Sequence, residues 1–331
     1  MICYINKAVS IGPLANSALI AALAVLLSHT ALTAQFEVET TVEFIRDENG
    51  PDELSGLTRG SDGRWWAVDD RTGKLYPCRV GFDRSGSVEK FEASEGVKLE
   101  GCSDAEGCAA DPLRADIVYV SDEKNTSVTA HDVKTGKCVE KVPLPEEFRS
   151  NVRWNRSIEA LCISPDGLRL WAANEDTLKC DGECATAQKG GTVRILAFTR
   201  KGAGAPWKFV GWSRYPTDAI GGKPFRNRTM SGLVSLADLG DGSLLALERE
   251  MSRKNPLFPS FRSRLYRFRP AAAAGGEVAK ELLWGDDVFF SNYEGMALCP
   301  TDQSGKRYVL LVSDGGGEAV ESVRTLLLKG K

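Results

Sequence analysis

Histidine is almost absent from this chain of 331 residues, in which only His29 and His131 occur. Because His29 belongs to an N-terminal apolar leader, a Ser-His-Asp hydrolase, a histidine-nucleophile phosphatase or a histidine-ligated zinc site would depend on His131 alone. His131 lies in Thr-Ala-His-Asp-Val, which we expect to form an outer strand, and we interpret it as a half-exposed structural residue. Any catalysis must therefore use carboxylates and arginines, with or without a hard metal ion.

An excess of positive charge is also lacking. Lysine and arginine number 42 against 45 aspartate and glutamate residues, which gives a formal net charge of −3. The chain offers no basic arm or stripe to a polyanion. This composition excludes general nucleic-acid binding.

Long hydrophobic runs are missing as well. The apolar run Ala18–Leu27 has ten residues, which is too short to span a bilayer comfortably. It follows Lys7 and precedes small residues, an order typical of a cleaved secretory signal. We therefore predict a signal peptide over residues 1–34, no membrane span after its cleavage, and a secreted or periplasmic domain over residues 35–331. Leu32 stands where a small residue usually precedes the cleavage site, so an uncleaved N-terminal anchor is the alternative.

Nine cysteines are present, of which Cys3 lies in the predicted signal. The even number that remains suggests disulfide bonds in an exported protein, although eight cysteines allow 105 connectivities. Short spacing makes Cys102/Cys108 and Cys180/Cys184 the expected local pairs. A metal site at Cys180 and Cys184 is the weaker interpretation, because no second Cys/His pair accompanies them.

What the sequence does contain is an internal repeat. Each copy has a short apolar strand, a turn such as Asp166-Gly167, and a second apolar strand that ends in a carboxylate. The leading positions of the five copies are residues 55, 106, 159, 231 and 294, which are 51, 53, 72 and 63 residues apart. An irregular repeat of this length, with one strand-rich unit per copy, is typical of a β-propeller.

Short runs of Val, Ile, Leu, Trp and Tyr, broken by Gly, Asp, Asn and Pro, predict an all-β domain with little helix. Four strands are predicted in each of the first four copies, and only three in the last. The segment Phe36–Ile45 reads as a spare strand, which we expect to complete the last blade and close the ring. The prediction is a β-propeller of five four-stranded blades, although a sixth blade stays open in the longer loops.

Acidic residues recur at equivalent positions of the repeat. In a propeller the first strand of each blade lines the channel, and its start and the end of the second strand meet at one mouth. So many carboxylates would repel one another unless a cation neutralised them. Oxygen ligands without histidine or cysteine fit Ca²⁺, with Mg²⁺ or Mn²⁺ as second choices. The alternative is that the carboxylates cap turns and pair with neighbouring arginines. The predicted metal ligands are Glu106, Glu123, Glu159, Glu248, Glu294 and Asp314.

Arginines stand next to several of these carboxylates. Arg71, Arg156 and Arg249 each lie within three residues of an acidic position of the repeat. Guanidinium groups recognise phosphate or carboxylate through paired hydrogen bonds. Beside metal-binding carboxylates they would form a site for a phosphate-like anion, unless each arginine only balances the charge of its neighbour. Together with Glu159, these three arginines are the predicted catalytic residues.

The order of these motifs resembles that of the phytase-like family, described as having the esterase-like activity of phytase. The matching segments are Ser55-Gly-Leu57, Asp70-Arg71, Asp104-Ala-Glu106-Gly107, Ser121-Asp-Glu123, Asn155 to Gly167, Leu247-Glu248-Arg249, Asn292 to Met296 and Val312 to Asp314. The resemblance covers roughly residues 52–329 and implies a β-propeller, often exported, whose acidic residues take part in phosphoester hydrolysis. One departure is Gly315-Gly-Gly after Asp314, where members often have Asn-Asn-Phe.

The residues and the resemblance together predict an exported, Ca²⁺-dependent phosphoric ester hydrolase. Metal-activated water would attack the phosphate ester at the channel mouth, and the cation would offset negative charge in the transition state. The expected partner is a small anionic phosphate-ester substrate, bound by a monomer. Two alternatives stay open: a non-catalytic binding propeller with a structural channel metal, and a carboxylic ester or lactone hydrolase that uses the same carboxylates.

Overall fold

A computed structural model describes residues 36–45, 53–223, 230–252, 260–288, 291–301, 305–314 and 322–330. Within it, Val38–Lys329 form one compact unit, the β-propeller. The second unit, Met1–Glu37 with Gly330–Lys331, lies almost wholly outside the described residues. The predicted signal peptide over residues 1–34 also lies outside them, so its cleavage stays a prediction. In the segments described, no helix combines the length and apolar character needed to cross a membrane.

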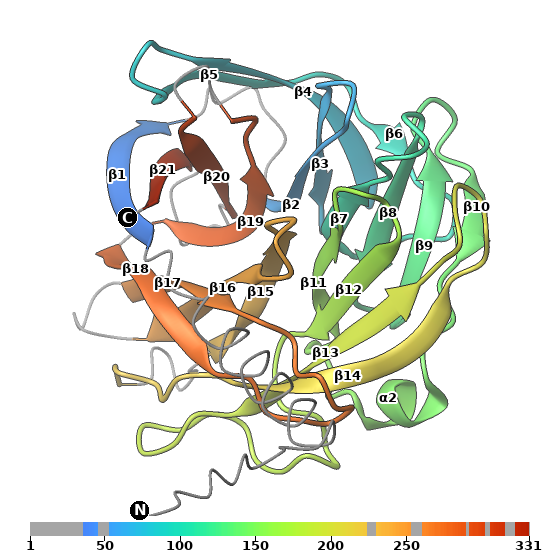
Figure 1. The fold of residues 1–331 in the computed structure, drawn as a ribbon, viewed down its shortest axis with the longest axis vertical. Coiled ribbons are helices and arrows are strands. Elements are labelled where there is room, and N and C mark those ends of the chain that lie inside the picture. Colours follow the sequence, from blue (N-terminus) through green and yellow to red (C-terminus); the bar gives the residue numbers. More distant parts are fainter. Residues whose placement is uncertain are drawn as a thin grey trace, which may run out of the picture. The chain divides into compact units, whose positions relative to one another are not determined.

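Five blades surround the centre of the propeller, as predicted (Figure 1). The first blade contains β2 (Leu54–Arg59), β3 (Trp65–Asp69), β4 (Lys74–Phe82) and β5 (Val88–Ala93), with β6 (Val97–Lys98) paired to β4. The second contains β7 (Ala105–Ala110), β8 (Ile117–Asp122), β9 (Ser127–Asp132) and β10 (Cys138–Lys141). The third contains β11 (Ile158–Ile163), β12 (Arg169–Asn174), β13 (Thr192–Thr199) and β14 (Lys208–Pro216). The fourth contains β15 (Met230–Asp238), β16 (Leu244–Ser252), β17 (Ser260–Phe268) and β18 (Lys280–Val288).

The fifth blade is built from both ends of the domain. Its strands are β19 (Asn292–Leu298), β20 (Arg307–Asp314), β21 (Ser322–Gly330) and, outermost, β1 (Phe36–Ile45), which is hydrogen-bonded to β21. The spare N-terminal strand therefore completes the last blade, as predicted, and the described residues contain no sixth blade. This pairing closes the ring and covers strand edges that would otherwise promote aggregation.

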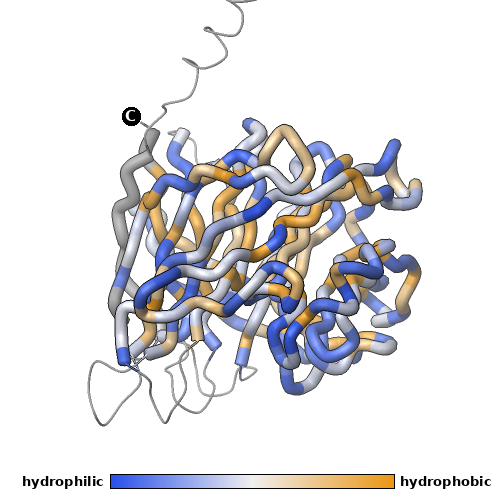
Figure 2. Tube along the Cα trace, turned by 90° about the horizontal axis from the view of Figure 1, so that it is seen from below, coloured by the Kyte–Doolittle hydropathy of each residue, from blue (hydrophilic) through white to orange (hydrophobic). Residues whose placement is uncertain are grey.

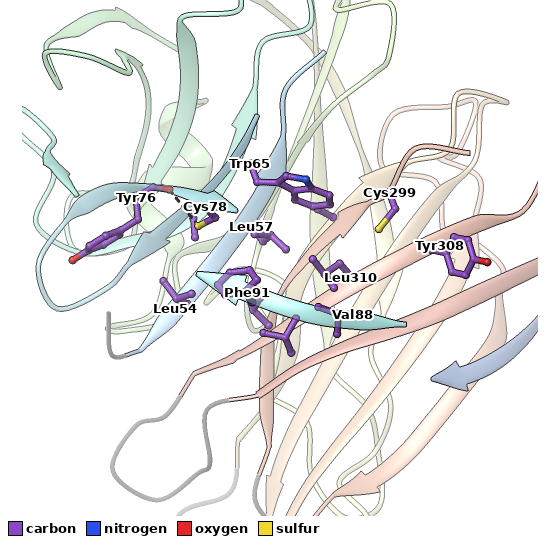
Figure 3. Packing of buried hydrophobic residues seen from close by; sticks show 14 of the residues in the cluster. Leu54, Leu57, Trp65, Tyr76, Cys78, Val88, Phe91, Cys299, Tyr308 and Leu310 are labelled. Carbon is purple, nitrogen blue, oxygen red and sulfur yellow. Dashed lines mark hydrogen bonds between the residues drawn. The ribbon is translucent and has the colours of Figure 1, made fainter. Parts of the chain in front are cut away.

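The hydrophobic core lies between adjacent blades. Each blade is covered on both faces by its neighbours. Its strands are therefore nearly continuous apolar runs, and all five residues of β3, for example, are buried. Between the first and fifth blades, Leu57, Trp65, Phe91 and Leu310 belong to one buried cluster (Figure 3). Figure 2 shows apolar residues concentrated in the strands and hydrophilic residues in the connecting loops. The core is therefore shared, and each blade depends on its neighbours for burial.

A buried ion pair links the second and third blades. Arg200 donates to both carboxylate oxygens of Asp111, at 2.5 and 2.8 Å, and neither side chain is exposed. Burial by itself would raise the pKa of Asp111, but hydrogen bonds from Arg200 and Arg114 outweigh burial and hold that pKa below its ordinary value.

Arg200→Met should therefore lower the free energy of unfolding by about 3–5 kcal/mol, because a buried carboxylate loses its main partner. Urea denaturation measures this loss. Lys90→Met, in the exposed Lys90–Glu92 pair, should cost only about 0–1 kcal/mol, and equal losses would contradict the expectation.

The two predicted disulfides are wrong. Every cysteine among the described residues is a free thiol, so neither Cys102/Cys108 nor Cys180/Cys184 forms a bond. Spacing along the chain did not account for where these side chains lie in the fold. The thiol of Cys108, for example, is buried and faces the backbone carbonyl of Trp66 at 3.9 Å.

His131 is a structural residue, but it is fully buried rather than half-exposed. It lies on β9, the third strand of its blade, and both ring nitrogens have partners. Nε2 is 2.8 Å from the hydroxyl of Thr129, and Nδ1 is 3.1 Å from the carbonyl of Gly136. Burial lowers the pKa of His131, which keeps the ring neutral in its structural role.

Candidate functional site

β-Bulges interrupt three innermost strands at the acidic positions of the repeat. In β7, β11 and β19 the register with the second strand of the blade shifts at Glu106, Glu159 and Glu294. A bulged residue has no partner opposite it, and the local bend directs its side chain away from the regular pleat. The bulges thus bring a glutamate from each of three blades toward one site. In β15 the shift lies further along, between Leu233 and Ser235.

Glycine follows two of these glutamates because adjacent innermost strands touch there. The strands β2, β7, β11, β15 and β19 form a closed ring around the centre (Figure 1). A Cβ atom at Gly107 would lie 2.3 Å from the carbonyl oxygen of Glu159, and one at Gly56 would lie 2.3 Å from that of Glu106. These distances leave no room for any side chain. The Ser-Gly and Glu-Gly pairs of the repeat therefore set the close approach of the blades at the level of the carboxylates.

The carboxylates meet in two overlapping groups. One oxygen each from Glu106, Glu123 and Glu159 lies within 4.8 Å of the other two. The same is true of Asp70, Asp104 and Glu106. Glu106 belongs to both groups and so lies at the centre of what we call the carboxylate cluster. At these separations like charges repel strongly unless protons or cations intervene.

Burial and mutual repulsion raise the pKa values of the cluster. Burial, followed by the charges of Glu294 and Glu123, holds the pKa of Glu106 well above its usual range. Burial and then the charge of Glu106 do the same to the pKa of Glu159. Burial raises the pKa of Glu123 to about 7. It raises the pKa of Glu294 to about 8, although the charge of Arg249 opposes this rise.

Several cluster oxygens have no hydrogen-bond donor within the described parts of the chain. Glu106 and Glu159 are only 8% and 6% exposed, yet neither carboxylate makes a hydrogen bond or ion pair with a described residue. The buried Oδ1 atoms of Asp70 and Asn292 also lack a partner there. Unpaired buried acceptors are costly, and a coordinated cation removes that cost. The donors are all oxygen atoms and therefore fit Ca²⁺, which takes 6–8 oxygen ligands.

Arg156 and Arg249 adjoin the cluster and share one carboxylate. Arg156 Nη1 donates to one oxygen of Glu175 at 2.5 Å, and Arg249 Nη2 donates to the other at 3.3 Å. Arg249 Nη2 also pairs with Glu294 at 2.7 Å, while its buried Nε has no acceptor among the described residues. Burial would lower the pKa of Arg249, but the charges of Glu294 and Glu175 outweigh burial and raise it, so the guanidinium stays charged.

Glu248 is engaged outside the carboxylate cluster. Its carboxylate pairs with Lys280 and accepts hydrogen bonds from Tyr215 Oη at 2.8 Å and from the backbone N–H of Asp218 at 3.0 Å. Successive residues of a strand point to opposite faces, so the register that brings Arg249 to the cluster turns Glu248 away from it. The repeat correctly located an acidic residue, Glu248, at the end of this strand. It could not show which face of β16 the side chain of Glu248 would occupy.

Arg71 and Asp314 lie at the edge of the cluster. Arg71 forms an ion pair with Glu53, and 61% of the Arg71 side chain is exposed. Asp314 accepts a hydrogen bond from Asn292 Nδ2 at 3.2 Å. Burial, followed by the charge of Asp314, raises the pKa of Asp70 to about 7. Asp314 is thus close enough to the cluster to affect its ionisation.

Asp70 and Asp104 contribute to the cluster but were not among the predicted metal ligands. The signal was present, since Asp104 stands two residues before Glu106 and alternate residues of an extended chain share a face. Asp70 directly follows β3, where the second strand of the repeat ends. A rule that counted every carboxylate at these positions would have included both.

Comparison with known families agrees with the motif order. The family model "Phytase-like", described as esterase-like activity of phytase, matches residues 51–315. The chain belongs to the phytase-like family. The match includes all the predicted site residues of this phytase-like protein. It also confirms the resemblance suggested by segments such as Asp104–Gly107 and Asn292–Met296.

Other comparisons of the phytase-like protein find distant similarity. No match was found among curated proteins. Among solved structures, the PQQ-bound aldose sugar dehydrogenase from Streptomyces coelicolor is 13% identical, with a TM-score of 0.45 over 90% of this chain and 99% of that chain. Glutaminyl cyclase from Myxococcus xanthus is 11% identical, with a TM-score of 0.41 over 89% and 98%. A putative 6-phosphogluconolactonase from Bacteroides uniformis is 13% identical, with a TM-score of 0.39 over 81% and 80%. Similarity at this level carries no argument about activity.

Proposed function

We propose that this phytase-like propeller is an exported, Ca²⁺-dependent phosphoric ester hydrolase, with Mg²⁺ or Mn²⁺ as second choices of metal. The observation that carries the proposal is the meeting of Glu106, Glu123 and Glu159 beside Arg156 and Arg249. Carboxylate oxygens bind hard cations, and guanidinium groups bind phosphate. The cluster therefore offers one set of groups to the metal and another to the anion that the metal attracts.

The proposed metal ligands are Glu106, Glu123 and Glu159, with Glu294 and Asp314 extending the set. Asn292 Nδ2 donates to both Glu294, at 2.9 Å, and Asp314, at 3.2 Å, and so orients these two carboxylates. When bound, a divalent cation supplies Lewis-acid activation of water and offsets negative charge on the phosphoryl oxygens.

Arg156 is the arginine that we assign to phosphate binding from solvent. Its side chain is 21% exposed, against 5% for Arg249, and Glu175 accepts from only its Nη1 group. Its other N–H groups donate to no side chain in the described part of the protein and are available to an incoming anion. Arg249, held by Glu175 and Glu294, is more deeply placed and keeps a fixed positive charge beside the reacting group.

Glu159 is the proposed proton acceptor. Its carboxylate lies within 4.8 Å of those of Glu106 and Glu123, beside the place where a bound cation would hold the attacking water. Its carboxylate makes no hydrogen bond with a described residue, so both oxygens are available to water and to the metal. Glu159 lies on β11, and its backbone carbonyl lies against Gly107, the residue that follows Glu106.

A phosphatase assay tests this proposal. The purified protein should release 4-nitrophenol from 4-nitrophenyl phosphate when Ca²⁺ is present and should lose this activity in a chelator. Activity that does not respond to chelation would contradict the metal requirement. A chelator that lowers the melting temperature of a protein with no turnover would favour the binding propeller. Hydrolysis of a carboxylic ester or lactone alone would favour the other alternative.

A further inference from the structure

A pocket of about 490 Å³ opens beside the carboxylate cluster, lined by residues that flank the second and third blades. Glu123 and Asp104, two members of the cluster, form part of its wall. Lys124, Lys179 and Trp154 also line it. The pocket therefore adjoins the proposed metal site. Unlike the carboxylate cluster, it also has cationic and aromatic side chains in its lining.

Trp154 is the most exposed large hydrophobic residue among those described, with 91% of its surface accessible. A tryptophan in a folded protein usually buries most of its large apolar surface. The turn that presents it is well defined: Arg153 and Arg156 form an isolated β-bridge around it, and Asn155 has a φ of 53°. Arg153 Nε donates to the carbonyl of Thr177 at 2.8 Å and anchors the turn to the third blade. The turn thus presents the indole ring to solvent at the rim of the pocket.

Neither lysine of the pocket is held in an ion pair with a described carboxylate. Lys124 and Lys179 are exposed and form no ion pair with a described residue. The charge of Lys124 does oppose the burial that raises the pKa of Asp104. Arg153 donates its hydrogen bonds to backbone carbonyls. The lining has three cationic side chains, Lys124, Arg153 and Lys179, against two carboxylates, so this balance favours an anion, while the aromatic rim suits a flat apolar group.

We propose that this pocket binds the leaving group of the substrate and that the leaving group is a planar aromatic ring, stacked on Trp154. The substrate class is then an aromatic phosphate ester. Because Glu123 belongs to both the pocket and the carboxylate cluster, the inference rests on the proposed function. Lys124 and Lys179 draw the phosphate dianion toward the mouth, and Trp154 holds the ring while the phosphoryl group lies at the cluster.

Hydrolysis of such an ester is balanced with water as the only co-reactant. The bond between phosphorus and the aryl oxygen breaks, and a bond between phosphorus and the water oxygen forms. The protons of water end on the aryl alcohol and on inorganic phosphate. A ring that stacks on Trp154 leaves the pocket as the aryl alcohol.

Binding of non-hydrolysable analogues tests the pocket without requiring turnover. Calorimetry in Ca²⁺ would compare phenylphosphonate with methylphosphonate, which carries the same anion without a ring. We expect wild-type protein to bind phenylphosphonate about tenfold more tightly, as aromatic stacking generally allows. Trp154→Ala should abolish this preference, and Trp154→Phe should retain most of it. Phe209→Ala, which removes an aromatic side chain 38% exposed on β14, should leave the preference unchanged.

The result that would overturn the inference is a wild-type protein with no ring preference, or a preference that survives Trp154→Ala. Cyclohexylphosphonate binding as tightly as phenylphosphonate would also overturn it, because the contact would then be apolar without being aromatic. Failure of the proposed function gives a different result. A ring preference that depends on Trp154, in a protein that hydrolyses no phosphate ester, would leave an aromatic-anion pocket standing and would remove both the hydrolase and the leaving-group role that rests on it.

Discussion

Glu159→Gln is expected to reduce Ca²⁺-dependent hydrolysis of 4-nitrophenyl phosphate by about 100-fold or more. The amide keeps the shape of the side chain but removes one negative charge and the proposed proton acceptor. Because Glu159 lies within 4.8 Å of Glu106 and Glu123, the change also lowers the charge offered to the metal. Steady-state kinetics over a range of Ca²⁺ concentrations would measure both effects.

Two further measurements separate chemistry from metal binding. If higher Ca²⁺ restores the rate of the Glu159→Gln variant, the main loss is affinity for the metal. If the rate stays low at saturating Ca²⁺, Glu159 acts in proton transfer. Glu92→Gln is the matched control, since Glu92 is an exposed residue of β5 paired only with Lys90 among the described residues. A Glu159→Gln protein as active as this control would contradict the assignment.

Addition of Ca²⁺ to the metal-free protein is expected to raise the melting temperature by roughly 5 °C. A ligand present at 100 times its dissociation constant adds about 2.7 kcal/mol to the free energy of unfolding. For a domain of this size that amount corresponds to a shift of several degrees. Scanning calorimetry with Ca²⁺, and with NaCl at equal ionic strength as the control, would measure it.

The rise in melting temperature caused by Ca²⁺ should depend on pH, because protons and Ca²⁺ bind the same carboxylates. The pKa values of Asp70, Glu123 and Glu294 are about 7, 7 and 8 in the folded protein, against about 4.3 or less for such carboxyls in an unfolded chain. Between about pH 4.5 and pH 8 the folded, metal-free protein binds more protons, so its stability falls as pH rises. Ca²⁺ replaces those protons and should stabilise the protein more at pH 8 than at pH 5.

Glu106→Gln supplies the corresponding variant. It removes the charge at the centre of the cluster, so it should raise the melting temperature of the metal-free protein at pH 8 and reduce the shift caused by Ca²⁺. A shift of equal size at pH 5 and pH 8 would count against the site, as would a shift that Glu106→Gln leaves intact.

Much of the fold could be predicted because a propeller repeats one simple pattern. The alternation of Phe36–Ile45 and the missing strand of the last copy were enough to predict how the ring closes. The short helix α2 (Glu146–Asn151) was not predicted, since six residues carry too little periodicity to recognise. The disulfides were wrong because spacing along the chain does not show where the cysteine side chains lie in the fold.

The candidate site was harder to predict because it depends on register. The repeat led to Glu106, Glu159 and Glu294, and all three fall at β-bulges that no composition rule foresees. In the fourth blade the bulge of β15 lies at a different place, and on β16 Arg249 faces the cluster while Glu248 pairs with Lys280. A shift of one residue reverses the face to which a side chain points.

By itself the sequence determined the class of this protein: five strand-rich repeats, acidic residues at matching positions, and too little histidine for the common hydrolytic sites. Only the tertiary structure decided which carboxylates share a site, and it added Asp70 and Asp104 while leaving Glu248 outside. The physical reason is that residues far apart in the chain come together through bulges and through glycine contacts such as that of Gly107 with Glu159. Those contacts depend on how neighbouring blades pack, which no local segment of the sequence specifies.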